Sequence, residues 1–269
     1  MSKFKEFHYH LNTDKFLEGS EDLTFILMSD MHNHVYGPGN VLLLEAVEAR
    51  RPDAVLVTGD MLIAHSEESF TPALELFQRI REKKLPVFYG NGNHEYRMRI
   101  RPEIYGTMYE EYTKGLRDCG VILLENKSIP FEKNGLKMRI YGFELDWKYY
   151  EKLNHAPFHP GELTGVFGRP DEESYNILLA HNPVYFDSYA AWGADLTVSG
   201  HLHGGIIRIP GIGGVISPQA RLFPRYDAGH FQKDGRDLIV SRGLGTHTVN
   251  IRIFNPAELS VIHLHPLKK

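Results

Sequence analysis

Residues 25–32 have the sequence Phe-Ile-Leu-Met-Ser-Asp-Met-His, in which four apolar residues are followed by a serine, an aspartate and, two positions on, a histidine. A short, uninterrupted apolar run is typical of a β-strand that is covered on both faces of its sheet. Asp30 and His32 therefore stand just beyond the end of the predicted strand. Aspartate and histidine are both metal-ligand types, so this stretch predicts a buried strand that delivers ligands at its carboxyl end.

The same pattern recurs along the chain. Apolar runs at 54–57, 87–89 and 177–180, and a weaker one at 194–198, are each followed by a polar block. In chain order, the blocks are Gly59-Asp60, Gly92-Asn93-His94-Glu95, His181 and Gly200-His201-Leu202-His203. In open α/β sheets, ligands bind at the carboxyl ends of the strands, so these strand ends are predicted to converge on one crevice.

The spacing within the blocks fits a pair of metal ions. In an extended chain, residues i and i+2 face the same way and lie roughly 6.5 Å apart, so Asp30 and His32 can hold one ion. His201 and His203 can each reach a different ion, and Asp60 can bridge two ions that are about 3.5–4 Å apart. The predicted metal ligands are seven side chains: Asp30, His32, Asp60, Asn93, His181, His201 and His203.

The order of the blocks, Asp-x-His, Gly-Asp, Gly-Asn-His-Glu, His and Gly-His-x-His, resembles the calcineurin-like metallophosphoesterase superfamily. Further tracts at 51–54, 201–205, 208–210 and 240–245 are similar to its bacterial branch of small phosphoesterases, whose members often carry a membrane anchor. The resemblance implies an α/β fold, the four-layer α-β-β-α sandwich of the metallophosphoesterase type. It also implies a dinuclear metal-dependent phosphoesterase that hydrolyses a phosphodiester or phosphomonoester by attack of a metal-bridging hydroxide.

The resemblance further implies a set of ligands for each ion: Asp30, His32, Asp60 and His203 for the first, and Asp60, Asn93, His181 and His201 for the second. His94 would be a catalytic residue that stabilises charge or protonates the leaving oxygen. Many members have an aspartate three residues after the bridging one, where this chain has Ile63. Because that aspartate can orient the histidine, what holds His94 is left open, with Glu95 as a candidate.

Side chains near the Asn-His block suggest contacts to substrate. Arg97, Arg99 and Arg101 follow it closely, and a guanidinium can grip a phosphate with two hydrogen bonds. We predict that Arg97 contacts the phosphate, and a solvated loop with surface ion pairs is the alternative. The histidines outside the blocks show no ligand spacing, and two of them, His34 and His247, are candidates to support the ligands from outside.

Single blocks of this kind also arise by chance, as a turn or as a core histidine, but their joint order at successive strand ends argues against chance. Other chemistries find little support, because Cys119 is the only cysteine and the chain has no Gly-x-x-x-x-Gly-Lys-Ser/Thr loop and no His-Glu-x-x-His helix. Two alternatives stay open. One is a hydrolase of a lipid-linked or nucleotide-sugar pyrophosphate, and the other is a non-catalytic metal-binding scaffold module.

The length and composition of the chain limit the number of domains and the class of partner. The chain has 269 residues, of which 42% are hydrophobic and 24% charged, and the ligands spread from residue 30 to residue 203, so we predict a single domain over 1–269. Residues 1–22 would form an N-terminal strand and lead-in, and 23–265 the catalytic core. A net charge of −4 favours a small phosphate-ester substrate over a stable nucleic-acid partner.

The sequence contains no apolar stretch that would serve as a signal peptide or membrane anchor, so we expect a cytoplasmic protein. The cofactors would be two divalent or trivalent ions, and mixed carboxylate, amide and imidazole ligands suit Mn, Fe, Zn or Co. The oligomeric state is left open.

Periodicity predicts the remaining elements. Helices are expected at 40–50, 70–84, 103–117 and 183–192. Further strands are expected at 7–11, 121–125, 136–142, 206–209, 238–241, 250–254 and 260–264. The stretches 146–173 and 217–235 look irregular, and their aromatic residues would line a pocket or pack over a sheet edge.

Overall fold

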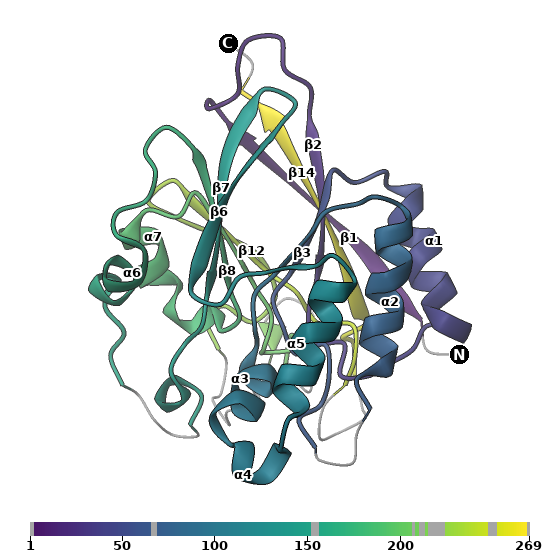
Figure 1. Ribbon diagram of the computed structural model, residues 1–269. Helices are drawn as coiled ribbons and strands as arrows, with labels where there is room; N and C mark the ends of the chain where they lie inside the picture. Colours follow the sequence, from purple (N-terminus) through teal and green to yellow (C-terminus); the bar gives the residue numbers. More distant parts are fainter. Residues whose placement is uncertain are drawn as a thin grey trace.

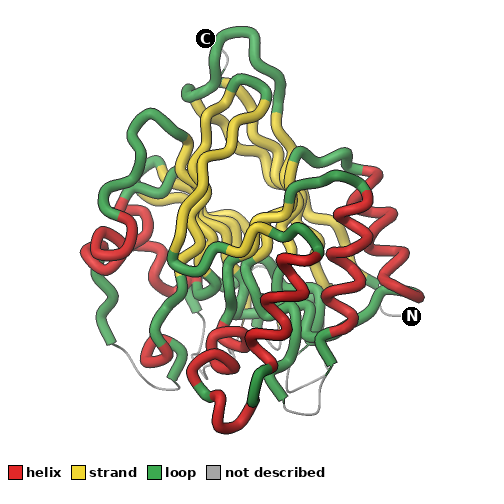
Figure 2. The backbone as a smooth tube through the Cα atoms, viewed as in Figure 1, coloured by secondary structure: helices red, strands yellow, loops and turns green. Residues whose placement is uncertain are grey.

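The computed structural model describes residues 3–65, 69–151, 156–205, 208–209, 213–214, 224–246 and 252–267. Its strands form two six-stranded sheets, with helices on the outer sides of the pair (Figures 1 and 2). A separate two-stranded hairpin joins β10 (Arg208–Ile209) and β11 (Gly213–Gly214). The predicted order of layers, helix, sheet, sheet and helix, is therefore confirmed.

The first sheet has the strand order β1-β14-β2-β3-β4-β5. Strands β2 to β5 are parallel, whereas β14 is antiparallel to β2 and parallel to β1. The bounds are Phe4–Thr13 (β1), Leu23–Met28 (β2), Ala54–Val57 (β3), Val87–Tyr89 (β4), Ile122–Leu123 (β5) and Ala257–Pro266 (β14). The first and last strands of the chain thus pair side by side at one edge of this sheet.

The second sheet has the order β12-β13-β9-β8-β7-β6. Its four central strands are parallel, and an antiparallel hairpin closes each edge. The bounds are Lys127–Lys133 (β6), Leu136–Phe143 (β7), Tyr175–Ala180 (β8), Leu196–Ser199 (β9), Gly229–Lys233 (β12) and Arg236–Val240 (β13). Because the central strands are parallel, the carboxyl ends of β8 and β9 lie at the same edge.

Helices α1 to α5 cover the first sheet, and α6 and α7 cover the second (Figure 1). Their bounds are Val41–Ala49 (α1), Thr71–Glu82 (α2), Asn93–Ile100 (α3), Pro102–Tyr105 (α4), Met108–Asp118 (α5), Pro160–Phe167 (α6) and Phe186–Trp192 (α7). Short 3-10 helices occur at Pro38–Asn40, Trp147–Tyr149 and Pro183–Tyr185. Across the described residues, we find no helix with the length and apolar character that crossing a bilayer requires.

The strand β2 shows why continuous apolar runs mark the centre of this fold. Ile26 and Met28 pack among the helices, whereas Phe25 and Leu27 face the second sheet. All four side chains are fully buried. Successive strand residues point to opposite faces, so a strand that is covered on both sides needs an apolar residue at every position.

Several predicted elements were wrong. The helix expected at 103–117 is broken into α4 and α5 by Gly106, whose φ of 56° does not fit a right-handed helix. The stretch 146–173, expected to be irregular, contains α6, which begins at Pro160 and buries Leu163. Proline is well suited to the first helical turn, where its missing N–H costs nothing.

The C-terminal half also differs from expectation. Strand β12 lies within the supposedly irregular stretch 217–235 and pairs with β13. The run at 250–254 forms no strand in its described part, which starts at residue 252, and residues 250–251 lie outside the described residues. Edge pairings of this kind depend on a partner strand that a local pattern does not identify.

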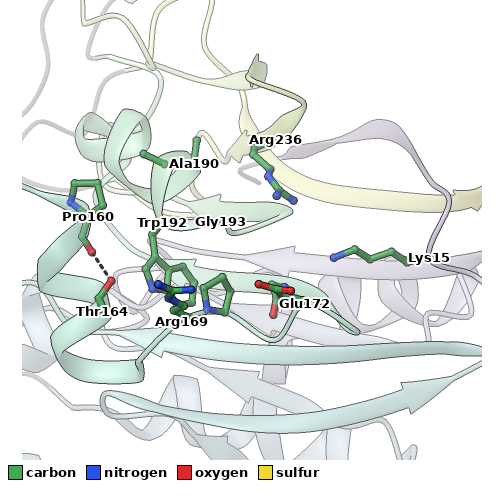
Figure 3. A pocket seen from close by; sticks show the side chains of 12 residues that line it. Lys15, Pro160, Thr164, Arg169, Glu172, Ala190, Trp192, Gly193 and Arg236 are labelled. Carbon is green, nitrogen blue, oxygen red and sulfur yellow. Dashed lines mark hydrogen bonds between the residues drawn. The ribbon is translucent and has the colours of Figure 1, made fainter.

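A cavity of about 670 Å³ lies beside α6 and α7, with Lys15, Arg169, Trp192 and Arg236 among its lining residues (Figure 3). Lys15 and Arg236 both pair with the carboxylate of Asp195, so much of their charge is neutralised. The cavity lies at the amino ends of β8, β9 and β13, and none of the predicted ligands lines it.

Candidate metal centre

The predicted ligands lie in the loops that follow β2, β3, β8 and β9 and at the start of α3, which follows β4. All of these strand ends meet at one edge of the two sheets. Five of the seven side chains belong to residues that are at most 8% exposed: Asp30, His32, Asp60, His181 and His201. Charged and imidazole groups are rarely buried together unless they bind an ion or one another.

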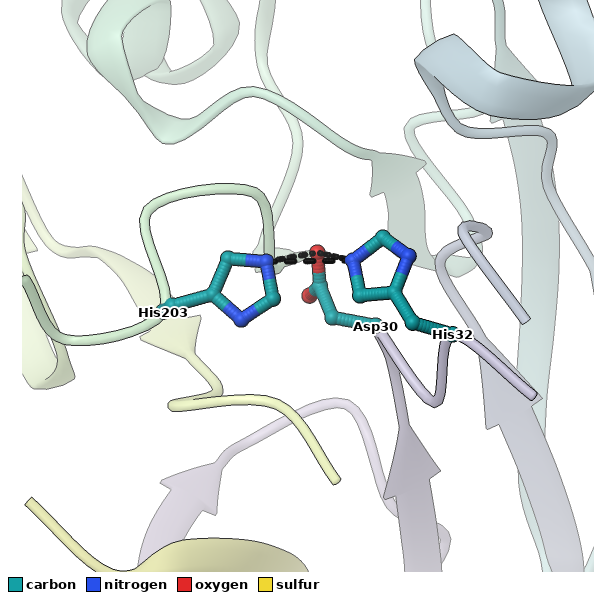
Figure 4. A group of neighbouring side chains, drawn as sticks. All are labelled: Asp30, His32 and His203. Carbon is teal, nitrogen blue, oxygen red and sulfur yellow. Dashed lines mark hydrogen bonds and ion pairs between the residues drawn. The ribbon is translucent and has the colours of Figure 1, made fainter. Parts of the chain in front are cut away.

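Asp30, His32 and His203 form the first cluster, in which the ligand atoms lie within 4.8 Å of one another. The His203 Nε2 is 3.3 Å and the His32 Nε2 is 3.8 Å from Asp30 Oδ1. The Nε2 atoms of the two histidines are also only 3.1 Å apart, so both rings point toward the carboxylate (Figure 4). Three donor atoms that converge in this way are suited to a single ion.

Asp60, His181 and His201 form the second cluster. His181 Nε2 lies 3.2 Å from Asp60 Oδ2 and also 3.8 Å from Asp30 Oδ1, so the two clusters adjoin. Among the described residues, neither Asn93 Oδ1 nor His201 Nε2 has a hydrogen-bond partner, although both atoms are buried. Buried acceptors of this kind call for an ion or water, and the donor set therefore fits a metal centre.

The backbone is strained at the same positions. Five of the predicted ligands, Asp30, His32, Asp60, His201 and His203, have φ between 47° and 68°. Each non-glycine residue in this left-handed region costs on the order of 1–3 kcal/mol, and such residues concentrate at functional sites. The fold thus holds these side chains in place against their local backbone preference.

Two glycines are required by close packing at the centre. A Cβ on Gly92 would overlap the carboxylate of Asp60, and a Cβ on Gly200 would overlap the hydroxyl of Ser29 and the carboxylate of Asp30. The glycines in the sequence blocks therefore let neighbouring backbone approach the acidic ligands.

The electrostatics favour cation binding. Burial works to raise the pKa of Asp60, but the charges of His181 and His94 outweigh it and hold this pKa well below its usual range. Burial works to lower the pKa of His181, but Asp60 and Asp30 raise it to about 9. In the absence of an ion, a proton on His181 thus provides positive charge that a bound cation would replace.

A sequence profile described as calcineurin-like phosphoesterase matches residues 23–205, which include all seven predicted ligands. The chain belongs to the calcineurin-like phosphoesterase family. It is accordingly a metal-dependent phosphoric ester hydrolase, as the sequence predicted.

Relatives of this phosphoesterase match over nearly its whole length. The uncharacterized metallophosphoesterase YkuE of Bacillus subtilis is 31% identical over 253 residues, which cover 91% of this chain and 80% of YkuE. Phosphodiesterase YaeI of Escherichia coli is 23% identical, with 93% and 84% covered. UDP-2,3-diacylglucosamine pyrophosphatase LpxG of Chlamydia muridarum is 24% identical, with 89% and 83% covered.

Solved structures agree on the fold. A 5'-nucleotidase precursor from Thermus thermophilus superposes with a TM-score of 0.52 at 16% identity. The match covers 83% of this chain and 49% of that chain, so this phosphoesterase spans about half of the nucleotidase.

Glu95 does not hold His94, contrary to the candidate role considered for it. Its buried carboxylate accepts hydrogen bonds from the backbone N–H groups of Asp60 (2.9 Å), Met61 (3.1 Å) and Gly92 (3.0 Å), and from the hydroxyl of Tyr89 (2.7 Å). Burial, together with the charge of Asp60, raises the pKa of Glu95 to about 7. The carboxylate thus ties the Asp60 loop to the start of α3, where Glu95 is the third helical residue and caps the N–H of Gly92.

His94 is held by the backbone. Its Nδ1 accepts a hydrogen bond from the N–H of Ala64 at 2.8 Å, one residue beyond Ile63. Since Nδ1 acts as an acceptor, the ring proton of the neutral imidazole is on Nε2, which lies 3.9 Å from Asp60 Oδ2. The N–H of Ala64 therefore fixes the ring of His94 although the family aspartate is missing at position 63.

Arg97 lies on α3, and its Nη2 donates to the carbonyl of Ala64 at 2.6 Å. Its Nε is buried without a partner among the described residues. Arg99, two residues further along the same helix, pairs with Glu144 at 2.7 Å. Arg97 thus contacts Ala64, the residue whose N–H holds His94, whereas Arg99 is paired with Glu144.

Two further residues, Tyr150 and Arg252, lie against the centre. The ring of Tyr150 packs edge-on against His201, with ring centroids 5.2 Å apart. Arg252 donates through Nη2 to the carbonyls of Arg242 (2.8 Å) and Gly243 (3.0 Å), in the loop whose Gly245 N–H bonds to Asp30 O at 2.6 Å. Tyr150 lies in the stretch 146–173, whose aromatic residues were expected to line a pocket or pack over a sheet edge, whereas Arg252 belongs to no polar block and no pattern singled it out.

His34 and His247 were predicted to support the metal ligands from outside the centre. His34 packs against Tyr36, with ring centroids 4.7 Å apart, and burial and the charge of Arg252 lower its pKa. His247 lies outside the described residues.

Glu95→Gln is expected to lower both stability and metal affinity. The carboxylate has four donors, and an amide nitrogen in place of one oxygen would leave buried N–H groups unpaired, at a cost of about 1–3 kcal/mol each. We expect the Tm of the metal-free protein to fall by about 2–10 °C. Thermal unfolding and Mn²⁺ titration measure the two effects. A lower Tm with unchanged Mn²⁺ affinity would show that Glu95 does not support the metal ligands.

Proposed function

We propose that this phosphoesterase hydrolyses a small phosphodiester or phosphomonoester at a centre of two metal ions. The observation that carries the proposal is the adjacency of the two ligand clusters, with His181 Nε2 within 3.8 Å of both Asp30 and Asp60. Two ions in these positions would supply Lewis acidity and an activated water. The proposed ligands of the first ion are Asp30, His32, Asp60 and His203, and those of the second are Asp60, Asn93, His181 and His201.

The residues around the ligands set their donor atoms in place. His181 Nδ1 donates to the carbonyl of Thr58 at 2.6 Å, which leaves Nε2 with its lone pair for an ion. The backbone N–H of His94 donates to Asp60 Oδ1 at 2.8 Å, so the other oxygen, Oδ2, faces His181. Asp60 is thus oriented before substrate arrives, and we propose that it bridges the two ions.

We propose that His94 acts on the substrate through its Nε2–H. The ring lies beside the centre, 5.0 Å from the ring of His32, and its proton is held on Nε2 by the bond from Ala64 to Nδ1. From this position, Nε2–H would donate a hydrogen bond to a phosphoryl or leaving oxygen. A donor that is aligned beforehand stabilises the charge that develops in the transition state.

The substrate is expected to be small. The relatives named phosphodiesterase and UDP-2,3-diacylglucosamine pyrophosphatase support a diester, with a pyrophosphate of a nucleotide sugar as the second candidate. A panel of aryl phosphomonoesters, aryl phosphodiesters, cyclic nucleotides and nucleotide-sugar pyrophosphates, each with Mn²⁺, Fe²⁺, Zn²⁺ or Co²⁺, tests the proposal. We expect the fastest turnover on a diester. If no ester in the panel is hydrolysed with any metal, the proposal fails and a scaffold role replaces it.

Since the proposed ligands come from both sheets, we further propose that residues 1–269 act as one catalytic unit. A truncation after β5 would remove His181, His201 and His203 and is expected to bind no pair of ions.

Arg97→Ala is expected to raise KM about tenfold or more if Arg97 contacts the phosphate, because a hydrogen bond to a charged group is worth about 1.5–3 kcal/mol. Arg99→Ala is the matched control, since Arg99 lies on the same helix and pairs with Glu144. Steady-state kinetics on an aryl diester measure both variants. A fall in kcat with an unchanged KM would instead show that Arg97 acts through Ala64 and His94.

A further inference from the structure

Four histidines that are not part of the proposed metal centre line up at the edge of the first sheet. His8 and His10 lie on β1, and His263 and His265 lie on β14, its parallel neighbour. In the register, His10 pairs with His263, so the rings alternate between the two strands. Neighbouring rings in the order 8, 263, 10, 265 are stacked with centroids 4.7–5.3 Å apart and planes within 16°. We call these four residues the histidine ladder.

The facing nitrogens are close enough to share one cation. His8 Nδ1 lies 3.0 Å from His263 Nε2, and His10 Nδ1 lies 2.9 Å from His265 Nε2. At these distances each pair is joined by a hydrogen bond in which one ring nitrogen donates its N–H to the other. A bound cation would replace the shared proton, and the two rings would turn so that both lone pairs point to the ion.

The outward nitrogens are arranged as in metal-bound histidines. His265 Nδ1 lies 2.9 Å from a carboxylate oxygen of Asp22, which only accepts, so Nδ1 carries the proton and Nε2 presents a lone pair to His10. His8 Nε2 faces Glu6 at 3.4 Å in the same way, although Glu6 also pairs with Arg50. Histidines that ligate a metal usually donate their second N–H to such a carboxylate, which fixes the tautomer.

The rings are open to solvent, since the side chain of His8 is 36% and that of His265 is 28% exposed. An ion can therefore reach the pairs without any opening of the fold.

We propose that the histidine ladder is a second metal site, which binds a divalent late transition-metal ion, Ni²⁺, Cu²⁺ or Zn²⁺, between paired imidazoles of β1 and β14. Imidazole ligands suit these ions, whereas Mg²⁺ and Ca²⁺ prefer oxygen. A bound ion would join the first strand of the chain to the last. It would thereby add to the backbone pairing and the side-chain contacts that hold this sheet edge.

The first test is retention of the full-length, untagged protein on an immobilised Ni²⁺ resin. The imidazoles of the proposed metal centre are less exposed than the ladder, since His181 and His201 are 1% and 8% exposed and the side chain of His203 is 15% exposed. We expect the unaltered protein to be retained until imidazole is added and the double variant His10→Gln/His263→Gln to flow through. His230→Gln, which alters a partly exposed histidine bound to Asp237, is the control and should be retained. Equal retention of the double variant, or no retention of the unaltered protein, would overturn the proposal.

The second test is titration of Ni²⁺ into protein whose catalytic centre is already loaded with Mn²⁺. Asp22→Asn should weaken Ni²⁺ binding about 10–100-fold, as loss of a carboxylate behind a ligating histidine usually does. Hydrolysis of the best substrate should be unchanged in all ladder variants, which also shows that they fold. Equal Ni²⁺ affinity in the Asp22→Asn and unaltered proteins would contradict the assigned role of Asp22 and, with it, the site.

Discussion

Asp60→Asn is expected to abolish hydrolysis, with kcat reduced at least about a thousandfold, because removal of a group central to transition-state stabilisation has effects of this order. The carboxylate of Asp60 faces both His94 and His181, at 3.9 and 3.2 Å. Asparagine keeps the size of the side chain but removes the negative charge that we propose to lie between two cations. The rate is measured by turnover of an aryl phosphate ester, and the metal content by elemental analysis. We expect fewer than two ions per chain in the variant.

A matched control separates this effect from general loss of stability. Asp195 is also a buried aspartate, but it pairs with Lys15 and Arg236 at the amino ends of the strands. Asp195→Asn is expected to lower Tm while the metal content and the kcat stay close to those of the unaltered protein. If Asp60→Asn kept its rate and both ions, the bridging assignment would be wrong.

Replacement of His94 should lower kcat by about 10²–10⁴ while both ions stay bound, as expected for a group that hydrogen-bonds the reacting oxygen. Asparagine at this position can keep an acceptor for the N–H of Ala64 but has no donor near the place of Nε2. Glutamine is longer and can place an N–H closer to the centre. We therefore expect His94→Gln to be faster than His94→Asn, and single-turnover rates measure the difference.

Metal content decides whether His94 acts on the substrate or on an ion. Its ring nitrogens lie close enough to those of His32 and the carboxylate of Asp60 to complete a third possible cluster. If His94→Asn lost one ion per chain, His94 would be a ligand, and the proposed contact with the substrate would be abandoned.

The sequence was most informative at the strand ends. Continuous apolar runs such as 25–28 predicted strands that are buried on both faces, and polar residues directly after them identified the loops of the centre. These signals are local, since the periodicity and the following block occur within a few residues of each other. The position of Asp30 next to His203 then follows from parallel strands whose carboxyl ends meet.

Contacts that depend on backbone or on distant pairing could not be predicted. The partner of His94 is the N–H of Ala64, and a backbone group has no sequence signature. Glu95 was misjudged because its carboxylate turns back to the Asp60 loop rather than toward the histidine beside it. The histidine ladder arises only when β1 pairs in parallel with β14, at a separation of 255 residues along the chain.

The most direct test of the central claim is a crystal structure of the Mn²⁺-loaded protein with anomalous scattering recorded for the metal. We predict two anomalous peaks about 3.5–4 Å apart, with the carboxylate of Asp60 between them. His203 should contact one ion and His201 the other. A single peak, or two peaks that Asp60 does not bridge, would contradict the two-metal centre on which the proposed function depends.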